Sequence, residues 1–306
     1  MALYIAKRVA QIVPLLLIIA FVVFIALEMA PGDPATLLLG QNATPAEVAK
    51  LNADLGLDRP VVVQYLSFVG DAVQGDLGQS YRSGRDVVSE LSRTVGVSAT
   101  LAITAMLLAI IVGVSVGIIS AVKQYTWIDN VVRVGVLALV SVPVFWLAIL
   151  LIIMFSVKLS LFPAFGWGTY DHLVLPALAL STYPLAVIAR LTRSSMLEVL
   201  GSDYVRTARA AGMPERTVVL KYSLKNALGP VMTVIGLQFG ALIGGAVLTE
   251  TVFGIPGLGR LMVTAIEGRD YPLVRGAVLL GTVVFVLINL IVDVLYKWVD
   301  PRQREI

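Results

Sequence analysis

The chain has 306 residues, of which 58% are hydrophobic and only 14% are charged. Soluble domains are nearer half apolar and a quarter charged, so this composition, with its long uncharged runs, indicates an all-α protein that crosses a membrane several times. The absence of cysteine excludes disulfides, thiol nucleophiles and thiolate metal sites. We attribute the net charge of +3 to membrane topology and expect no nucleic-acid partner.

Six apolar runs are long enough to cross a bilayer, which takes roughly 20 helical residues. The first continues to Ala30 without a small-residue cleavage site, so we expect it to be retained as a span. The fourth is the weakest because Pro176 and Pro184 interrupt it, although spanning helices tolerate proline when neighbouring groups satisfy the freed carbonyls. The predicted spans are 9–30, 98–122, 132–157, 173–192, 229–250 and 276–297.

Lys and Arg residues orient these spans, because cytosolic loops carry an excess of them. With both termini in the cytosol, 14 of the 23 Lys and Arg residues lie inside, and most of the others are diluted in one long outer segment. This distribution predicts six helices with N-in, C-in topology. The predicted domains are 1–97, the first span plus an extracytoplasmic segment at 31–97, and 98–306, a five-helix core with a cytosolic loop at 193–228.

The outer segment has too regular a pattern for a linker. Thr44-Pro45-Ala46-Glu47 forms a capping box with proline at the first helical position, which predicts a helix over 45–55 that ends at Gly56. A second amphipathic stretch follows at 60–73. The pattern fits a lid packed on the outer membrane face and a docking platform for an extracytoplasmic partner equally well.

A polar interruption at 202–230 separates two apolar runs. Ser202 or Asp203 is placed to cap a short helix, and Gly212 is placed to end it in a left-handed conformation. Pro214 then opens a second helix with Glu215 in its first turn. A two-turn helix is marginal alone, so it needs a partner surface. An ordinary positively charged loop is the alternative.

Chemical motifs are informative mainly where they are missing. No Gly-Lys dipeptide occurs, so the chain has no P-loop, and its energy must come from another subunit or from an ion gradient. The string GVSVG at 113–117 matches a hydrolase nucleophile elbow, but it lies in a predicted span and not in a strand–turn–helix. An intramembrane hydrolase would lose activity on Ser115→Ala. The single histidine, His172, argues against a dedicated metal cage.

The chain resembles the permease subunits of ABC importers, and more specifically the dipeptide, oligopeptide and nickel permeases. In the polar loop the resemblance rests on TARAAG at 207–212 and NALGP at 226–230. It differs from the general importer pattern by having Arg206-Thr207-Ala208 in place of Glu-Ala-Ala, which agrees with the peptide branch. The other motifs are PGDPA at 31–35, LGLDRPVVVQYLSFVGDAVQGDLGQSY at 55–81 and PGLGRLMVTAIEGRDYP at 256–272.

The resemblance implies that the short helix is a coupling helix, which docks into a cleft on a cytosolic ATPase. It also implies a complex with a second homologous permease, two ATPase subunits that bind ATP and magnesium, and an extracytoplasmic solute-binding protein. The chain itself would be non-catalytic, with no cofactor, in the lipid of a bacterial inner membrane. The predicted coupling residues are Asp203, Tyr204, Arg206, Thr207, Ala208, Arg209, Ala210 and Gly212.

The fifth span carries glycines on one helix face, which lets membrane helices approach closely. That face is expected to pack statically, to line the pathway against the second permease, or to do both. The predicted pathway and interface residues are Gly236, Gln238, Gly240, Gly244 and Glu250. A di- or oligopeptide is the expected substrate, with glutathione, a nickel chelate or another small solute as alternatives. An ion-coupled secondary transporter is the alternative of another class.

Overall fold

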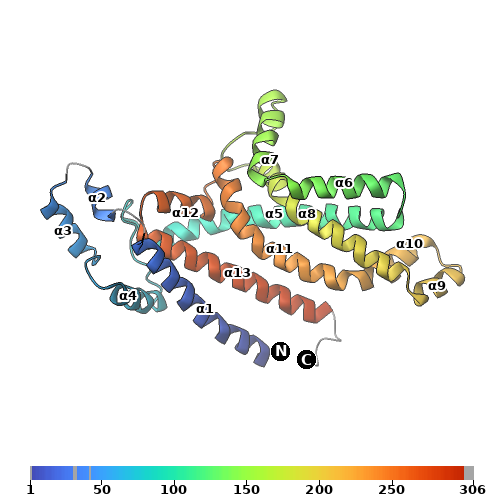
Figure 1. The fold of residues 1–306 in the computed structure, drawn as a ribbon, viewed down its shortest axis with the longest axis horizontal. Helices are drawn as coiled ribbons and strands as arrows, with labels where there is room; N and C mark the ends of the chain where they lie inside the picture. Colours follow the sequence, from blue (N-terminus) through green and yellow to red (C-terminus); the bar gives the residue numbers. More distant parts are fainter. Residues whose placement is uncertain (1, 30–32, 41–42, 300–306) are drawn as a thin grey trace. The chain divides into compact units, whose positions relative to one another are not determined.

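The computed structural model describes residues 2–29, 33–40 and 43–299, although the side chains of 2–12, 28, 243–245 and 292–299 are outside its description. Over these residues the only strand-like pairing is an isolated bridge between Gln79 and Asp86, which confirms the all-α prediction. In chain order the elements are α1 (Ala2–Glu28), α2 (Pro34–Leu39), α3 (Pro45–Asp54), α4 (Val61–Val73), α5 (Val87–Val122), α6 (Trp127–Ser141), α7 (Val144–Leu151), the π-helix η1 (Ile152–Lys158), α8 (Asp171–Leu200), α9 (Asp203–Ala210), α10 (Glu215–Thr217), the π-helix η2 (Val218–Ser223), α11 (Leu224–Val252), α12 (Leu258–Glu267) and α13 (Tyr271–Val299) (Figure 1).

The chain forms two compact units. Unit 1 consists of residues up to 98 together with 256–287, and unit 2 consists of 99–255 with the remainder of α13. Residues 256–272, which carry one of the family-like motifs, therefore fold with the outer segment. The predicted domain division at residue 97 stays a prediction.

Unit 1 is organised by aromatic contacts between α1 and α4. The rings of Phe21 and Phe24 meet Tyr65 edge-on at centroid distances of 5.3 and 5.7 Å, and the Tyr65 hydroxyl donates to the Leu17 carbonyl at 3.1 Å. The predicted capping box at Thr44 and Glu47 is present at the start of α3. The helix predicted over 45–55 is confirmed as α3, and the amphipathic stretch at 60–73 forms α4.

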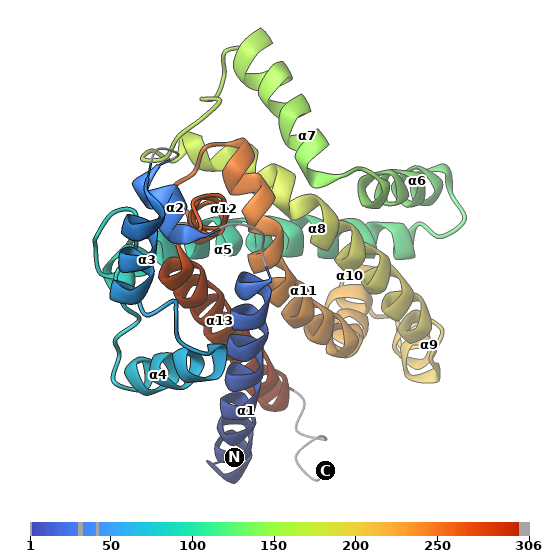
Figure 2. The same ribbon diagram turned by 60° about the vertical axis from the view of Figure 1, so that its left-hand side comes forward.

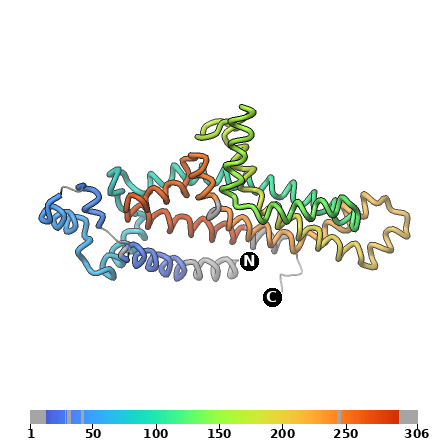
Figure 3. Tube along the Cα trace, turned by 45° about the horizontal axis from the view of Figure 1, so that its top comes forward, coloured from blue at the N-terminus to red at the C-terminus, as the bar shows by residue number. Residues whose placement is uncertain are grey.

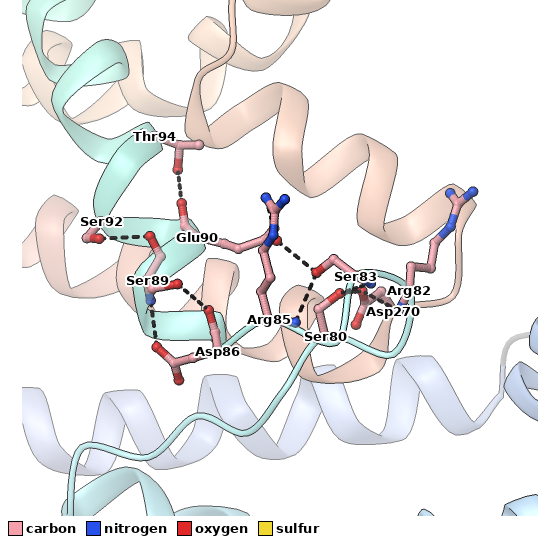
Figure 4. Close-up of polar contacts among 10 residues, drawn as sticks. All are labelled: Ser80, Arg82, Ser83, Arg85, Asp86, Ser89, Glu90, Ser92, Thr94 and Asp270. Carbon is pink, nitrogen blue, oxygen red and sulfur yellow. Dashed lines mark hydrogen bonds and ion pairs between the residues drawn. The ribbon is translucent and has the colours of Figure 1, made fainter.

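The buried carboxylate of Asp270 joins two distant motifs of unit 1. It accepts hydrogen bonds from the Ser80 hydroxyl and from the backbone N–H of Arg82 (Figure 4). It also accepts one from the backbone N–H of Tyr81, and it precedes the first turn of α13. In the same unit, a Cβ at Gly276 would lie 2.6 Å from Val87, so α13 approaches the start of α5 closely. The loop before α5 is therefore fixed by side chains nearly 200 residues away.

Unit 2 is built around α8, which lies beside α11 (Figures 1 and 2). Contact with α5 occurs through Gly113 and Gly117, where an added Cβ would lie 2.9 Å from the Leu185 carbonyl oxygen and 2.6 Å from Thr192 Cβ. Glycine at these positions lets two backbones touch, as small residues do in membrane helices. The GVSVG string is therefore a helix-packing motif within α5, and Ser115 between the two glycines is exposed.

The predicted third span, 132–157, is not one straight helix. The segment Trp127–Ser141 and the segment Val144–Lys158 meet at an angle of 103°, visible as a sharp turn between α6 and α7 (Figures 1 and 3). Pro143 explains the break, because it lacks an N–H and disfavours the helical region for the residue before it. Val142 accordingly adopts φ −89° and ψ 123°. Pro176 and Pro184, by contrast, lie within the continuous 30-residue α8.

Helices of membrane-spanning length are present in both units. Among the described residues, Val87–Val122, Asp171–Leu200 and Tyr271–Ile291 each suffice to cross a bilayer, and two bent helix pairs would raise that number to five. These segments identify a membrane protein with several apolar helices. The count of six spans stays a prediction.

Candidate functional site

The short polar helix α9 follows α8 after a two-residue turn. Ser202 occupies its N-cap with extended backbone angles, φ −74° and ψ 153°, as predicted. Its hydroxyl does not cap the helix, however, but donates to the Val199 carbonyl at 2.6 Å. Asp203 in the first turn and Arg209 in the last complement the helix dipole. The start of α9 is thus set by the chain turn and by charge, not by a side-chain cap.

One face of α9 is held against the chain by a small hydrophobic cluster. Val205 and Ala208, three residues apart, are buried with Val218 of η2, and Val199 and Leu200 at the end of α8 pack against them. An eight-residue helix does not persist in water alone, so this contact is what keeps α9 formed. Ala208, a predicted coupling residue, therefore faces the chain and allows α9 to lie close to η2.

Gly212 ends α9 in the predicted left-handed conformation, with φ +76°. Its N–H donates to the Arg209 carbonyl at 2.9 Å, and the Met213 N–H donates to the Ala208 carbonyl at 3.2 Å. These two bonds form a Schellman motif, which requires the positive φ that glycine adopts without strain. The turn is reinforced by the bidentate contact of Arg209 with Glu215, at 2.7 and 3.1 Å.

The opposite face of α9 is exposed and mixes charge with small side chains. Arg206 contacts Asp203 at 3.6 Å with both side chains in solvent, so this ion pair adds little stability. Hydrogen bonds from Arg209 lower the pKa of Glu215, so the carboxylate that pairs with Arg209 stays ionised to lower pH than a solvent-exposed glutamate. The predicted coupling residues on this open surface are Asp203, Tyr204, Arg206, Thr207, Arg209, Ala210 and Gly212.

The structure brings together two motifs that are separate in the sequence. Asn226, in the NALGP string, donates its side-chain amide to the Tyr204 hydroxyl and to the Tyr222 carbonyl, each at 2.9 Å. The start of α11 is therefore bonded directly to α9. The sequence pattern does not predict the π-helix η2 between them, and such π segments occur often at functional sites.

Unit 2 also contains a buried ion pair that the sequence pattern does not reveal. Asp129, in the first turn of α6, is fully buried and receives both Nε and Nη2 of Arg193 at 2.8 Å. In the sequence, Arg193 is one of many positive charges in the loop that the sequence predicts to be cytosolic. Its spacing of 64 residues from Asp129 carries no local signal.

The predicted pathway residues on α11 lie on different sides of the helix. Gly236 and Gly240 are buried within the chain, which agrees with static packing of that face, and Glu250 is fully buried. The surroundings of Gly244 are outside the described side chains. Gln238 instead lines a cavity of about 330 Å³ with Tyr183 of α8 and with Val142 and Pro143 at the α6–α7 break. Its carboxamide has no hydrogen-bond partner among the described residues.

The arrangement is that of a polytopic membrane protein with a polar helix fixed beside its apolar helices. Residues 113–305 match the family described as the binding-protein-dependent transport system inner membrane component, and residues 1–102 match the N-terminal component of the same systems. The chain belongs to this family. It is a permease subunit of an ABC importer in the inner membrane, and it works with ATPase and binding-protein partners.

Similar proteins cover nearly the whole chain. The dipeptide transport system permease protein DppB of Alkalihalophilus pseudofirmus is 42% identical over 98% of this chain and 99% of its own length. The glutathione transport system permease protein GsiC of Escherichia coli K12 is 44% identical over 98% of both chains. An inward-facing structure of the MetNI methionine ABC transporter shares the fold, with a TM-score of 0.57 and 20% identity over 70% of this chain and 97% of that one.

Proposed function

We propose that this chain is the permease subunit of an ATP-driven importer of short peptides, with α9 as its coupling helix. The observation that carries the proposal is the construction of α9: a short helix with one face fixed on the chain and the other left open. Because the chain has no P-loop, ATP and magnesium would bind on separate ATPase subunits. The open face of α9 is the surface on which such a subunit would dock. No cofactor is proposed for the chain itself.

The proposed assembly contains a second homologous permease, two ATPase subunits and an extracytoplasmic binding protein. We propose six spans with both termini in the cytosol, which place α9 and the ATPases on one side and residues 31–97 on the other. The folded α3–α4 segment supports a docking role for that outer region. The relatives transport a dipeptide and glutathione, itself a tripeptide, so their names favour a short peptide over a nickel chelate.

Reconstitution with the partner subunits tests the function. The complex, purified with the permease, ATPase and binding-protein products of neighbouring genes, is placed in liposomes with a dipeptide, glutathione or a nickel chelate. We expect ATP hydrolysis and uptake to rise only with the binding protein and a short peptide. Uptake by this chain alone that an ionophore abolishes would instead indicate a secondary transporter. Impermeant maleimide should label Met213→Cys and Asp58→Cys from opposite sides, because the chain has no cysteine of its own.

We further propose that Gln238 contacts the substrate on its way through the membrane. The cavity that it lines is within the usual size range of ligand sites and is mostly apolar with few polar groups. Irregular backbone at membrane depth, as at Val142–Pro143, is tolerated where it lines a cavity. Because the Gln238 carboxamide has no hydrogen-bond partner among the described residues, it is available to hydrogen-bond a peptide group of the substrate.

Gln238→Leu should slow uptake about fivefold, the effect of one lost hydrogen bond of about 1 kcal/mol. Peptide-stimulated ATP hydrolysis should continue. Gln238→Asn, which keeps the carboxamide, should retain more of the uptake rate and serves as the control. Unchanged uptake by the leucine variant in reconstituted liposomes would remove Gln238 from the pathway.

A further inference from the structure

The carboxylate of Asp129 is completely buried, and it accepts hydrogen bonds from three segments of unit 2. Besides the two bonds from Arg193 of α8, Oδ1 accepts from the Ser120 hydroxyl of α5 at 2.6 Å. Oδ2 accepts from the Tyr125 N–H at 3.2 Å, in the turn between α5 and α6. Four donors compensate a charge that would be very costly to bury alone. One side chain thus fixes the end of α5, the start of α6 and α8.

The turn that Asp129 holds is conformationally demanding. Tyr125 has φ +61°, a left-handed region that non-glycine residues rarely occupy because Cβ crowds the backbone there. The hydrogen bond that the Tyr125 N–H donates to Asp129 keeps this turn in place, and Arg193 in turn holds the Asp129 carboxylate. The connection between α5 and α6 is therefore built as a fixed corner.

A continuous buried path runs from this corner to α9. Met196, one turn after Arg193, is buried together with Ala121 of α5, Val219 of η2 and Ala227 of α11. Leu200 and Val199 pack against this cluster and also against the Val205–Ala208–Val218 cluster that carries α9. Displacing α9 therefore pushes on α8, η2 and the α5–α6 corner together.

We call α9, the end of α8, η2 and the α5–α6 corner the block. Two helices, α6 and α8, are interrupted by proline away from the block. α6 ends before Pro143, with the 103° bend, and α8 contains Pro184, which removes one helical hydrogen bond. Pro143 and Pro184 line the same cavity, so the two interruptions lie close together. When the block moves, we therefore expect the chain to bend near Pro143 and Pro184.

We propose that Asp129 and Arg193 are positioning residues that lock α9, the end of α8 and the α5–α6 corner into one body, which the ATPases move against the α6–α7 break. The inference rests on the proposed coupling role of α9. It predicts that the ion pair acts on energy coupling, since neither residue lies on the exposed face of α9.

Transport by the full complex in liposomes measures the coupling. Asp129→Asn and Arg193→Gln should each lower peptide uptake per ATP hydrolysed by about tenfold or more. The double variant should be no worse than either single one, because it leaves no unpaired buried charge. Arg190→Gln, on the same helix but exposed, is the matched control and should keep the wild-type ratio. Wild-type coupling in both single variants would overturn the proposal.

Distances between spin labels test whether α9, the end of α8 and the α5–α6 corner move as one body, without relying on these variants. Exposed Arg133 of α6 and Lys221 of η2, replaced by cysteine in this cysteine-free chain, report on the block. Their separation should stay unchanged when the wild-type complex binds ATP, whereas the separation of Arg133 from exposed Val157, beyond the break, should change. A change in the first pair, or none in the second, would overturn the proposal. A wild-type complex without ATP-dependent uptake would instead refute the proposed function.

Discussion

Gly212→Val is expected to remove most ATP-coupled uptake while leaving membrane insertion intact. The backbone at Gly212 has φ +76°, yet no atom lies within 4 Å of where a Cβ would stand. The penalty is therefore conformational and not steric crowding, at about 1–2 kcal/mol and more for a β-branched residue. Relief of that strain would open the two Schellman bonds and separate Arg209 from Glu215. A helix as short as α9 cannot keep its position after such a loss.

The measurement compares peptide-stimulated ATP hydrolysis with uptake in the reconstituted complex. Gly212→Asn is the matched control, because asparagine tolerates the left-handed region far better than valine and should keep most of the coupling. Expression and insertion of both variants should equal those of the wild type, since the residue is exposed and outside the apolar helices. Normal uptake per ATP by Gly212→Val would exclude a coupling role for the fixed end of α9.

Local signals in the sequence were enough to place the short helices. The capping box predicted the start of α3, and a glycine with a polar eight-residue stretch before it predicted α9 and its left-handed end. Such features depend on hydrogen bonds between residues that are close in the sequence, so the residue types at a few neighbouring positions are enough to predict them. The expected cap by the side chain of Ser202 or Asp203 was wrong: α9 has no side-chain cap, and the Ser202 hydroxyl donates to the Val199 carbonyl of the preceding turn.

Features that depend on distant residues were not predictable in the same way. Pro143 breaks its helix and Pro184 does not, although both interrupt apolar runs, because surrounding helices decide whether the chain stays helical. Arg193 lies 64 residues from Asp129, and Ser80 lies 190 residues from Asp270, so neither of these contacts has a local pattern. On α11, the sequence placed Gln238 among the pathway and interface residues, but it could not indicate that Val142, Pro143 and Tyr183 would line a cavity with it.

Gly117→Leu is expected to destabilise the permease strongly. A Cβ at this position would lie 2.6 Å from Thr192 Cβ and 2.7 Å from the Ala189 carbonyl oxygen. Backbone oxygen cannot move aside as a flexible side chain can, so α5 and α8 must separate. Overpacking of this kind costs about 3 kcal/mol or more, which corresponds to a Tm lower by roughly 6–12 °C. Since Thr192 precedes Arg193, the shift would also disturb the ion pair with Asp129.

Thermal unfolding of the purified complex in detergent tests this expectation through a graded series. Gly117→Ala should already lower the Tm, because the clash begins at Cβ itself, and leucine should lower it further. Gly135→Leu on α6 is the control, since a Cβ there meets no atom within 4 Å and should leave the Tm close to that of the wild type. Equal Tm values for Gly117→Leu and Gly135→Leu would mean that α5 and α8 do not touch in the membrane. The buried cluster that joins Ala121 of α5 to Met196 of α8 depends on the same approach of the two helices, so it would not form in the membrane either.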